Sequence, residues 1–305
     1  MQVWLHQFSI IQVLNIEKAS IAIFVKPELY QNEMEFKKII PAPALQPYVR
    51  CYWVFEVNGN DAPFSQLLFP FGSFELIFNL LNAPQMKMAG QQSSFVQPDS
   101  LYPGQFTRPF VLSYTQRAKC IGVSLHPWMG KLLFNIPAQE FTDRVTNINT
   151  VDDQGSLREK LLDAGTETEL IARLEMHLLN KLKSYQPDPV SSLIAKTILC
   201  NPTADGFKNI VSSIGFTRRR VEQRFLETTG LPMGFFVRKI RFQKAVALLR
   251  HGQQLSLTQI GLEAGYYDQA HFIREFRAFA GLTPSAFLKE SSEMKNFVSD
   301  LTLLG

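Results

Sequence analysis

The last third of the chain contains two helix-turn-helix patterns about 50 residues apart, and this pairing limits the fold more than any other feature. The second pattern is the sharper one, because Ser256-Leu257-Thr258-Gln259 has the spacing of a capping box. In such a box the Ser and Gln side chains bind the free amides at a helix start. Gly265 then supplies a turn, and Asp268 can cap another helix. The sequence therefore predicts two short helices joined by a tight turn.

The second helix of this pattern is predicted to have one apolar face. Phe272, Phe276 and Phe279 recur at helical spacing and indicate an inner stripe. The remaining faces would then carry the side chains that are available to a DNA groove, which are Gln269, Ala270, Ile273, Arg274 and Arg277.

The first pattern repeats the plan with weaker turn signals. An apolar face over 207–214 leads to a turn at Gly215-Phe216, and Thr217 can cap a helix that runs to about Thr228. Val221 and Phe225 are expected to point inward. A further amphipathic helix over 235–249 is expected to hold both patterns and to present cations to phosphate.

The residues Ile260-Gly261-x3-Gly265-Tyr266-x5-Phe272-x3-Phe276-Arg277-x3-Gly281-x-Thr283-Pro284-x2-Phe287 resemble the signature of the AraC/XylS transcription regulators. The resemblance covers roughly 190–290, with a lead-in helix over 190–199. Four positions depart from the family, since Val211 and Gly261 stand where Ala is usual, Gln223 where Arg is common, and Leu226 where Lys is common. The resemblance implies two recognition helices that enter major grooves about 34 Å apart.

Positional match to the family also implies roles for single side chains. The expected base contacts are Arg219, Glu222 and Gln223 in the first helix and Gln269, Ala270, Ile273 and Arg274 in the second. Gln can pair with adenine, Arg can pair with guanine, and Ala270 or Ile273 can touch a thymine methyl group. The expected phosphate contacts are Thr217, Arg218, Arg220, Arg224, Lys239 and Arg277. A structural alternative stays open for each, since Glu222 can simply balance the arginines beside it.

The charge of the chain is distributed unevenly. Residues 206–290 contain 13 Lys and Arg against 6 Asp and Glu, whereas the rest of the chain contains 18 against 21. Each cation placed on a phosphate releases a counterion, so a locally basic domain gains affinity for a duplex that the net charge of +4 conceals. The alternative is a solvated basic face without a partner.

The amino-terminal half consists of short extended runs broken by Pro, Gly and Asn. Aromatic and β-branched residues predict strands over 48–57, 66–69, 74–81, 110–116 and 118–125. Without long helices between them, these strands favour an antiparallel barrel or sandwich that can enclose a small ligand. Leu45-Gln46-Pro47-Tyr48-Val49 and Pro70-x-Gly72 are similar to the cupin-like sensor domain of some AraC-type regulators.

Two residues of this half are candidates for ligand binding. Glu75 can anchor a ligand from inside the barrel, although a carboxylate on the rim is the alternative that the pattern favours. Trp53 can line the same pocket or belong to the core. A cupin metal centre needs a cluster of His and carboxylate ligands, but this half has only His6 and His126 and no HxH pair. We therefore expect no metal, no cofactor and no catalytic residue.

Leucines recur at helical intervals over 151–183, with a break at Gly165 that predicts two helices. This stripe can pack on the barrel or form a dimer contact. The segment 184–189 contains two prolines and is expected to be a linker. Three widely spaced cysteines indicate a reducing cytoplasm, and the apolar run 21–25 is far shorter than the ~20 residues of a membrane span.

The predicted architecture is an α+β two-domain chain. It comprises an extension (1–35), a β-rich cupin-like barrel or sandwich as sensor (36–150), a helical linker that can also dimerise (151–187), an all-α double helix-turn-helix domain (188–290) and a tail (291–305). Met34-Glu35-Phe36-Lys37-Lys38 is typical of a protein start, so we hypothesise that the residues before it are dispensable or a misread start.

Sequence analysis thus favours a sequence-specific transcription regulator that is modulated by a small molecule. The expected partners are double-stranded DNA, a small-molecule effector, RNA polymerase and a second copy of the chain, without a membrane. Activation and repression are both compatible with this domain order. Two other classes stay open, namely a protein–protein interaction module built on helical pairs and a cupin-like enzyme with a DNA-binding appendage.

Overall fold

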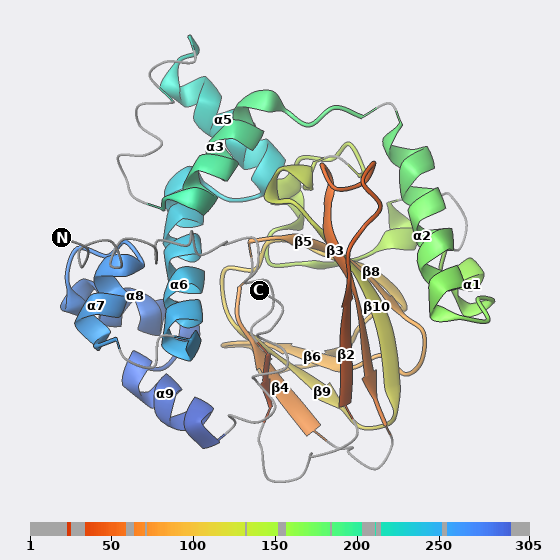
Figure 1. Cartoon of the computed structure of the whole chain (residues 1–305), viewed down its shortest axis with the longest axis horizontal. Coiled ribbons are helices and arrows are strands. Elements are labelled where there is room, and N and C mark those ends of the chain that lie inside the picture. Colours follow the sequence, from red (N-terminus) through yellow and green to blue (C-terminus); the bar gives the residue numbers. More distant parts are fainter. Residues whose placement is uncertain are drawn as a thin grey trace, which may run out of the picture.

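The computed structural model describes residues 23–25, 34–58, 64–70, 72–131, 133–151, 157–183, 185–202, 211, 215–251 and 255–293. Its amino-terminal half is built from two antiparallel β-sheets and its carboxy-terminal half from helices, which lie side by side (Figure 1). This is the predicted α+β two-domain architecture. No helix of the described residues is both long and apolar enough to cross a lipid bilayer.

The larger sheet has six strands in the order β11-β8-β5-β10-β3-β2. Their bounds are Val145–Asn147 (β11), Ser100–Pro103 (β8), Phe74–Asn79 (β5), Ala118–Leu125 (β10), Val49–Val57 (β3) and Met34–Ile39 (β2). The smaller sheet has the order β1-β4-β9-β6-β7. Its strands are Ile23–Val25 (β1), Phe64–Leu68 (β4), Phe110–Tyr114 (β9), Gln85–Met88 (β6) and Phe95–Val96 (β7).

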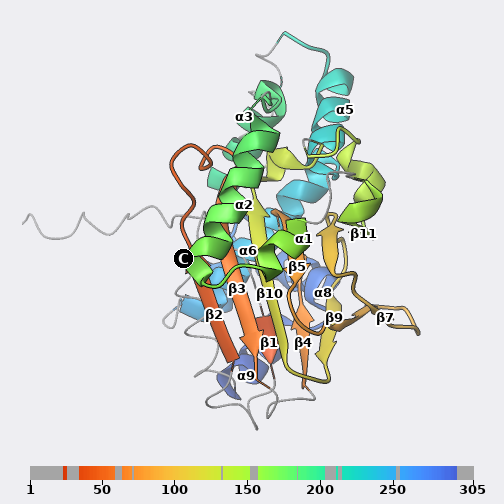
Figure 2. The ribbon, with the colours of Figure 1, turned by 90° about the vertical axis from the view of Figure 1, so that its right-hand side faces the viewer.

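The two sheets pack face to face around one core. Side chains of β3, β4, β6, β9 and β10 form this core, among them Phe55, Leu68, Met86 and Leu112. The sheets therefore form a closed sandwich, in which alternate residues of β3 and β5 face the space between the sheets. In Figure 2, the strands β2, β3 and β10 of the larger sheet lie side by side and run roughly from the top to the bottom of the view.

All five predicted strand segments are present, and β10 has the predicted bounds Ala118–Leu125. The pattern missed β2 and the short strands β6, β7, β8 and β11. The strand β6 contains the poor strand formers Gln and Lys, and strands of two to four residues carry little periodicity. The pattern also missed β1, which pairs with β4 inside the segment predicted as an extension. The rest of 1–33 lies outside the described residues, so the hypothesis of a dispensable start stays a prediction.

Two helices cover the outer face of the larger sheet, as Gly165 predicted. They are α1 (Leu157–Leu162) and α2 (Glu167–Leu182). Leu170, Leu174, Leu178 and Leu182 are buried in one core with side chains of β3 and β5. The leucine stripe of α2 therefore packs on the sheet, and the alternative of a dimer contact through these four leucines is wrong.

The carboxy-terminal helices begin and end at the predicted signals. They are α3 (Pro189–Cys200), α5 (Arg218–Thr229), α6 (Met233–His251), α7 (Leu257–Glu263), α8 (Gln269–Ala280) and α9 (Pro284–Glu293). Ser256 and Gln259 form the predicted capping box, and Gly281 ends α8 with φ +77°. The apolar face over 207–214 lies outside the described residues except for Val211.

The two halves share hydrophobic core. Two short 3-10 helices of the β-rich half, η4 (Pro127–Met129) and η5 (Ala138–Phe141), pack against α5, and a third, η6 (Ile148–Thr150), precedes α1. Phe141 and Trp128 thus belong to the same core as Phe225 of α5 and Phe236 of α6. In Figure 1, α6 stands between the sandwich and the α7–α8 pair, with α5 near its upper end.

Candidate nucleic-acid interface and ligand cavity

The helix α8 presents polar side chains to solvent on the face opposite its phenylalanines. Phe272, Phe276 and Phe279 are buried as predicted. Asp268 accepts a hydrogen bond from the backbone N–H of His271 at 2.6 Å, which fixes the start of the helix. The exposed residues are Gln269, Ala270, Arg274 and Arg277, and Ile273 is half-buried. The four expected base-contacting residues of α8 therefore lie on its accessible side.

The helix α5 also exposes its amino-terminal half, but its polar side chains are paired with one another. Val221 and Phe225 are buried as predicted, whereas Arg219 is exposed. Arg218 forms an ion pair with Glu222 at 2.8 Å, and Gln223 donates a hydrogen bond to Glu227 at 3.2 Å. Glu222 thus does balance a neighbouring arginine in this arrangement, while still facing solvent.

Two other cations of α5 pack around one aromatic ring. The guanidinium groups of Arg220 and Arg224 lie 5.5 and 5.1 Å from the ring centroid of Phe216. Arg224 also pairs with Asp188 at the start of α3. Burial acts to raise the pKa of the Asp188 carboxyl, but hydrogen bonds from Arg224 and Ser191 outweigh it and hold this pKa below its usual range. Arg224 is therefore partly committed to a contact within the protein.

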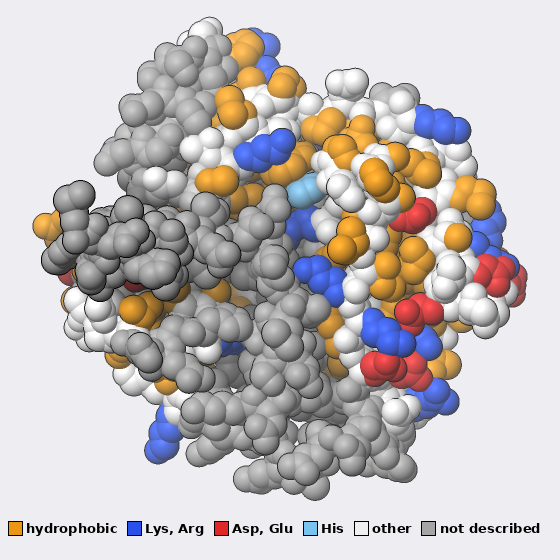
Figure 3. Space-filling model, in the orientation of Figure 1, with side chains coloured by type: hydrophobic (Ala, Val, Ile, Leu, Met, Phe, Trp, Pro, Cys, Tyr) orange, Lys and Arg blue, Asp and Glu red, His pale blue; other side chains and the backbone are white. Residues whose placement is uncertain are grey.

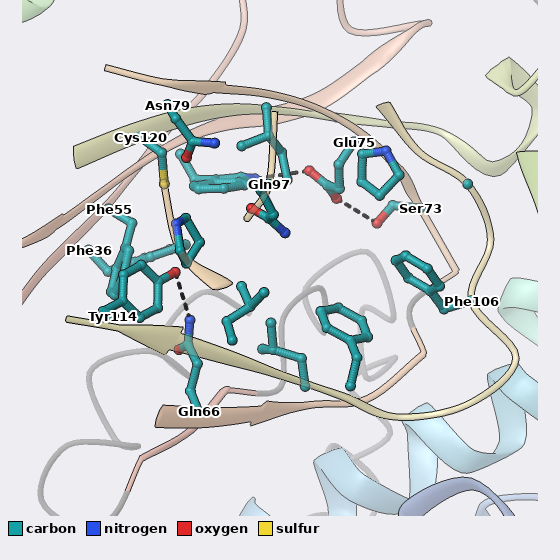
Figure 4. Close-up of a pocket in the computed structure, with 18 residues that line it drawn as sticks. Phe36, Phe55, Gln66, Ser73, Glu75, Asn79, Gln97, Phe106, Tyr114 and Cys120 are labelled. Carbon is teal, nitrogen blue, oxygen red and sulfur yellow. Dashed lines mark hydrogen bonds between the residues drawn. The ribbon is translucent and has the colours of Figure 1, made fainter. Parts of the chain in front are cut away.

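The space between the two sheets contains a cavity of about 100 Å³. Its wall is mainly apolar, with Phe36, Phe55, Leu68, Ile77, Phe106, Phe110 and Leu112 among the lining residues. Six polar side chains interrupt this wall, namely Gln66, Ser73, Glu75, Asn79, Gln97 and Tyr114. Figure 4 shows Glu75 and Asn79 on one side of the space and Gln66 and Tyr114 on the other.

Glu75 and Trp53, the two candidates for ligand binding, meet at the wall of this cavity. The indole N–H of Trp53 donates to Glu75 Oε2 at 2.9 Å. The hydroxyls of Ser73 and Ser124 donate to Glu75 Oε1 at 2.8 and 2.9 Å. A Cβ at Gly122 would lie only 2.0 Å from the Trp53 ring, so only glycine at this position leaves room for the indole.

Glu75 is only 8% exposed, so the alternative of a rim-facing carboxylate is wrong. Burial raises the pKa of Glu75 to about 7, against the three hydrogen bonds that favour its charged form. Its contact with a ligand stays a prediction.

A chain of hydrogen bonds joins this cavity to α6. The Gln105 side chain donates to the backbone carbonyl of Ser73 at 3.0 Å, and Gln105 Oε1 accepts from Lys239 Nζ. Lys239 also donates to the carbonyl of Phe106 at 3.1 Å. Because Ser73 and Phe106 line the cavity, the carboxy-terminal half contacts the cavity wall from behind.

A second connection runs through Phe69. Leu68 lines the cavity, whereas the next residue, Phe69, is 1% exposed and lies in the core of the second helix-turn-helix unit. Its ring is 5.7 Å from that of Phe242 and 6.2 Å from that of Phe287, measured between centroids. One peptide unit therefore links the cavity wall to the packing of α6 and α9.

Two family models match the chain. Residues 210–290 match a model described as a helix-turn-helix domain, and residues 37–147 match a domain of unknown function, DUF6597. With the two exposed helices and the capped turns, this match decides the class of the carboxy-terminal half. The chain carries a helix-turn-helix domain of the AraC type.

Relatives of this AraC-type domain are named as regulators. The chain is 40% identical over 68 residues to an uncharacterized HTH-type transcriptional regulator of Haemophilus influenzae, which covers 22% of each chain. It is 37% identical over 73 residues to the F1 operon positive regulatory protein of Yersinia pestis, covering 24% of each chain, and 26% identical over 119 residues to the HTH-type transcriptional regulator MtrA of Neisseria gonorrhoeae, covering 39% of each. The matches thus span 22 to 39% of the length of these relatives.

Among solved structures, ToxT from Vibrio cholerae O395 is similar over 85% of this chain and 98% of its own, with 11% identity and a TM-score of 0.41. The AraC-like transcriptional activator CuxR is similar over 94% of this chain and all of its own, with 9% identity and a TM-score of 0.26.

One expected contact of the AraC-type domain is corrected. Lys239 was expected at a phosphate, but its side chain is 0% exposed and its ammonium is bound to Gln105 and Phe106. The position faces the β-rich half, since α6 is covered by the sandwich on that side. Burial lowers the pKa of Lys239 to about 7. In this arrangement Lys239 cannot reach a phosphate.

Several residues of the cavity and of the domain contact were not singled out from the sequence. Gln66 and Gln105 are buried, but the residues around them show no regular alternation of apolar and polar side chains, so nothing local separates them from surface glutamines. Phe69 follows Leu68 in a predicted strand, so alternation predicts that the two side chains face opposite ways. Nothing in the pattern indicates that a helical domain receives Phe69.

Proposed function

We propose that the chain is a sequence-specific, DNA-binding transcription regulator whose helices α5 and α8 read base edges in successive major grooves. The observation that carries this proposal is the accessible polar side at the start of both helices of the AraC-type domain. A helix start also offers free backbone N–H groups and a partial positive charge, which suit phosphate oxygens.

Within this proposal, the side chains divide into two groups. Arg219, Glu222 and Gln223 of α5 and Gln269, Ala270, Ile273 and Arg274 of α8 are the proposed base contacts. Thr217, Arg218, Arg220, Arg224 and Arg277 are the proposed phosphate contacts, and Lys239 is left out because it is buried.

A salt bridge supports the proposed spacing of the two helices. Arg238 of α6 contacts Glu275 of α8 with its Nη2 at 3.1 Å, and the side chain of Glu275 is only 15% exposed. Phe225 of α5 packs on Phe236 of α6 with 5.5 Å between ring centroids. The same helix α6 thus contacts both recognition helices, and their separation follows from its length.

Selection of bound sites from random duplexes tests the proposal most directly. The full chain should enrich two motifs about one helical turn apart, and its affinity should fall steeply with added salt because counterions are released. A single motif contradicts the role of one of the helices. An affinity that hardly changes with salt contradicts DNA binding and favours a protein–protein interaction module instead.

We further propose that the β-rich half controls this domain through a small molecule. A ligand can shift an equilibrium only by its unequal affinity for two states, so the cavity must differ between them. The contacts from Ser73 and Phe106 to Lys239 support this coupling, because the cavity wall and α6 share them. DNA affinity measured with and without an effector checks it.

The surroundings of the regulator are also proposed from these relationships. The name of the Y. pestis relative describes a positive regulator, and we propose activation, with RNA polymerase as a partner in the cytoplasm. Two-fold homodimers are the commonest soluble oligomers, and we propose that this chain forms one. Its contact must use a surface other than the four buried leucines of α2, and sedimentation of the full chain measures it.

A difference in charge between the two halves supports the proposal that the carboxy-terminal half is the one that binds DNA. On the face shown in Figure 3, basic and acidic side chains lie next to one another over the β-rich half. In that half Lys37 pairs with Glu35 at 3.1 Å and with Glu167 of α2 at 3.2 Å. The excess of basic charge belongs to residues 206–290.

A further inference from the structure

The cavity between the sheets is small and its wall is mostly apolar. Its volume is about 100 Å³, and apolar cavities of about 150 Å³ hold a benzene ring. The aromatic rings of Phe36, Phe55, Phe106 and Phe110 form much of the wall. The cavity is therefore smaller than one that holds benzene, so a ligand of one ring with a short substituent is the upper limit and enters only if the wall moves outward slightly.

Two polar groups of the wall, Glu75 and Gln66, have acceptor positions that no described donor occupies. Glu75 receives three hydrogen bonds, and a carboxylate has about four acceptor positions. Oε2 receives only the Trp53 bond among the described residues, so one position is left on that oxygen. Across the space, Gln66 is 2% exposed, and its Oε1 has no hydrogen-bond partner among the described residues. Figure 4 shows Glu75 and Gln66 on opposite sides of the cavity.

The lining also lacks a cationic side chain that would balance the charge of an anion. None of the lining residues is Lys or Arg, and the nearby Lys239 is bound to Gln105 and Phe106 behind the wall. An anionic ligand would be desolvated beside the carboxyl of Glu75 without a compensating cation, which costs free energy. A cation instead gains from both the carboxylate and the faces of the aromatic rings.

We propose that this cavity binds a small aromatic compound that is not anionic and that donates a hydrogen bond to Glu75, as an aryl-methyl amine or a phenol does. The donor occupies the free position on Glu75 Oε2, and the ring packs among the phenylalanines. Aromatic carboxylates of the same size are rejected. This inference deepens the proposed ligand control, and only its effect on DNA rests on that proposed function.

Four probes of similar size test the ligand class on the full chain in the absence of DNA. Benzylamine and phenol should raise the unfolding temperature and shift the indole N–H signal of Trp53 in the NMR spectrum, because that group shares Glu75 with the ligand. Toluene should bind more weakly, and benzoate should have no effect. Benzoate binding as tightly as benzylamine overturns the proposal, and so does the failure of all four probes to bind.

Two variants tie the binding to the cavity. In Glu75→Gln the preference for benzylamine over toluene should fall about tenfold or more, because a hydrogen bond to a charged group is lost. Leu112→Phe fills the cavity and should abolish binding of every probe. Val111→Phe is the matched control, since this neighbour on β9 adds a ring outside the lining. Equal binding to the Leu112 variant and to the wild type overturns the assigned site.

Folding of each variant is checked by circular dichroism, and the proposed function is tested separately. Selection of duplex sites without any probe reports on DNA binding alone. Probe binding without a change in DNA affinity leaves the ligand class in place and removes the proposed coupling. Successful site selection with no probe binding removes the ligand class and leaves DNA binding in place.

Discussion

The two recognition helices differ in how firmly the β-rich half holds them. The helix α5 packs on η4 and η5, and Thr142 donates a hydrogen bond to the carbonyl of Gly230 just after it at 2.7 Å. Lys131 also pairs with Glu227 of α5 at 3.1 Å. By contrast, α8 packs on α6, α7 and α9, and Phe69 reaches only the core beneath it. Under the proposed ligand control, a change in the β-rich half therefore reaches α5 more directly than α8.

The two helices also differ in what their polar side chains already contact. Arg218, Gln223 and Arg224 of α5 have partners within the protein, so binding a duplex must replace these contacts. On α8, Arg274 and Arg277 have no ion-pair partner among the described residues. Under the proposed function, we therefore predict that α8 contributes more base discrimination than α5, although Gln269 of α8 also accepts a hydrogen bond from Thr258 at 2.9 Å.

Removing Phe69 should have the largest effect, because it breaks the two described ring contacts, with Phe242 and Phe287, between the β-rich half and the core under α8. We expect Phe69→Ala to lower the free energy of unfolding by about 3 to 5 kcal/mol, as for other buried phenylalanines. Chemical denaturation measures this loss, with Phe95→Ala as control because Phe95 is 41% exposed. Similar losses for both variants would show that the sensor does not support the second unit.

The buried Lys239 should make the docking of α6 depend on pH. Its pKa is lowered from 10.5 to about 7, so between these values the folded chain binds fewer protons than the unfolded chain. The free energy of unfolding should therefore increase with pH across this window, by on the order of 3 kcal/mol. Each pKa unit corresponds to about 1.4 kcal/mol, and relaxation of the structure around the amine reduces the full effect.

Thermal unfolding of Lys239→Met at several pH values provides the reference, since every other titrating group stays in place. The rise should be absent from this variant, in which Gln105 keeps its bond to Ser73. If the two proteins show the same dependence of unfolding temperature on pH, the lowered pKa of Lys239 is contradicted. The argument that the β-rich half packs more firmly on α5 than on α8 is then weaker.

Arg274→Ala should lower the affinity for a selected duplex by about 1 to 3 kcal/mol and relax the base preference at one position. The matched variant Arg218→Ala should cost less, because Arg218 must first leave Glu222. Binding isotherms on the selected site and on single-base variants measure both effects. An equal loss on every sequence would make Arg274 a phosphate contact and remove the difference between the helices.

The helix caps should give the smallest effects. Ser256→Ala should cost about 1 kcal/mol of stability, since it removes a hydroxyl that accepts from the backbone N–H of Gln259 at 3.3 Å and donates to the Gln259 side chain at 2.9 Å. Thr217→Ala should cost about half as much, because among the described residues the hydroxyl of Thr217 makes only the cap bond from the backbone N–H of Arg220, at 3.4 Å. Denaturation midpoints compare the two, and a larger loss at Thr217 would reverse the ranking of the turn signals.

Local signals predicted the second helix-turn-helix unit well. The capping box at Ser256, the cap at Asp268 and the left-handed turn at Gly281 act within a few residues, so the sequence contains them in full. The strand β10 was predictable for the same reason, because its run of apolar and β-branched residues has clear ends. The exposure of the polar side of α8 followed from its three phenylalanines.

The burial of Glu75 and Lys239 could not be predicted, because it depends on which distant element packs on each. Both faces of β5 are covered, one by α2 and one by the smaller sheet, so alternation alone does not place Glu75 inside. The sequence pattern places Lys239 among the surface cations of an amphipathic helix, and only its contacts with Gln105 and Phe106 in the folded chain show that it is buried. Contacts between residues more than a hundred positions apart carry no local signature.

The adjacency of Leu68 and Phe69 has a consequence for how such a protein can change. Two side chains on one peptide unit point in opposite directions, so pressure on the first is transmitted to the second without any intermediate residue. A substitution of Leu68 that changes the shape of the cavity will therefore also change how Phe69 packs in the core of the carboxy-terminal half. Under the proposed ligand control, a substitution at Leu68 therefore changes ligand selectivity and DNA affinity without ligand together.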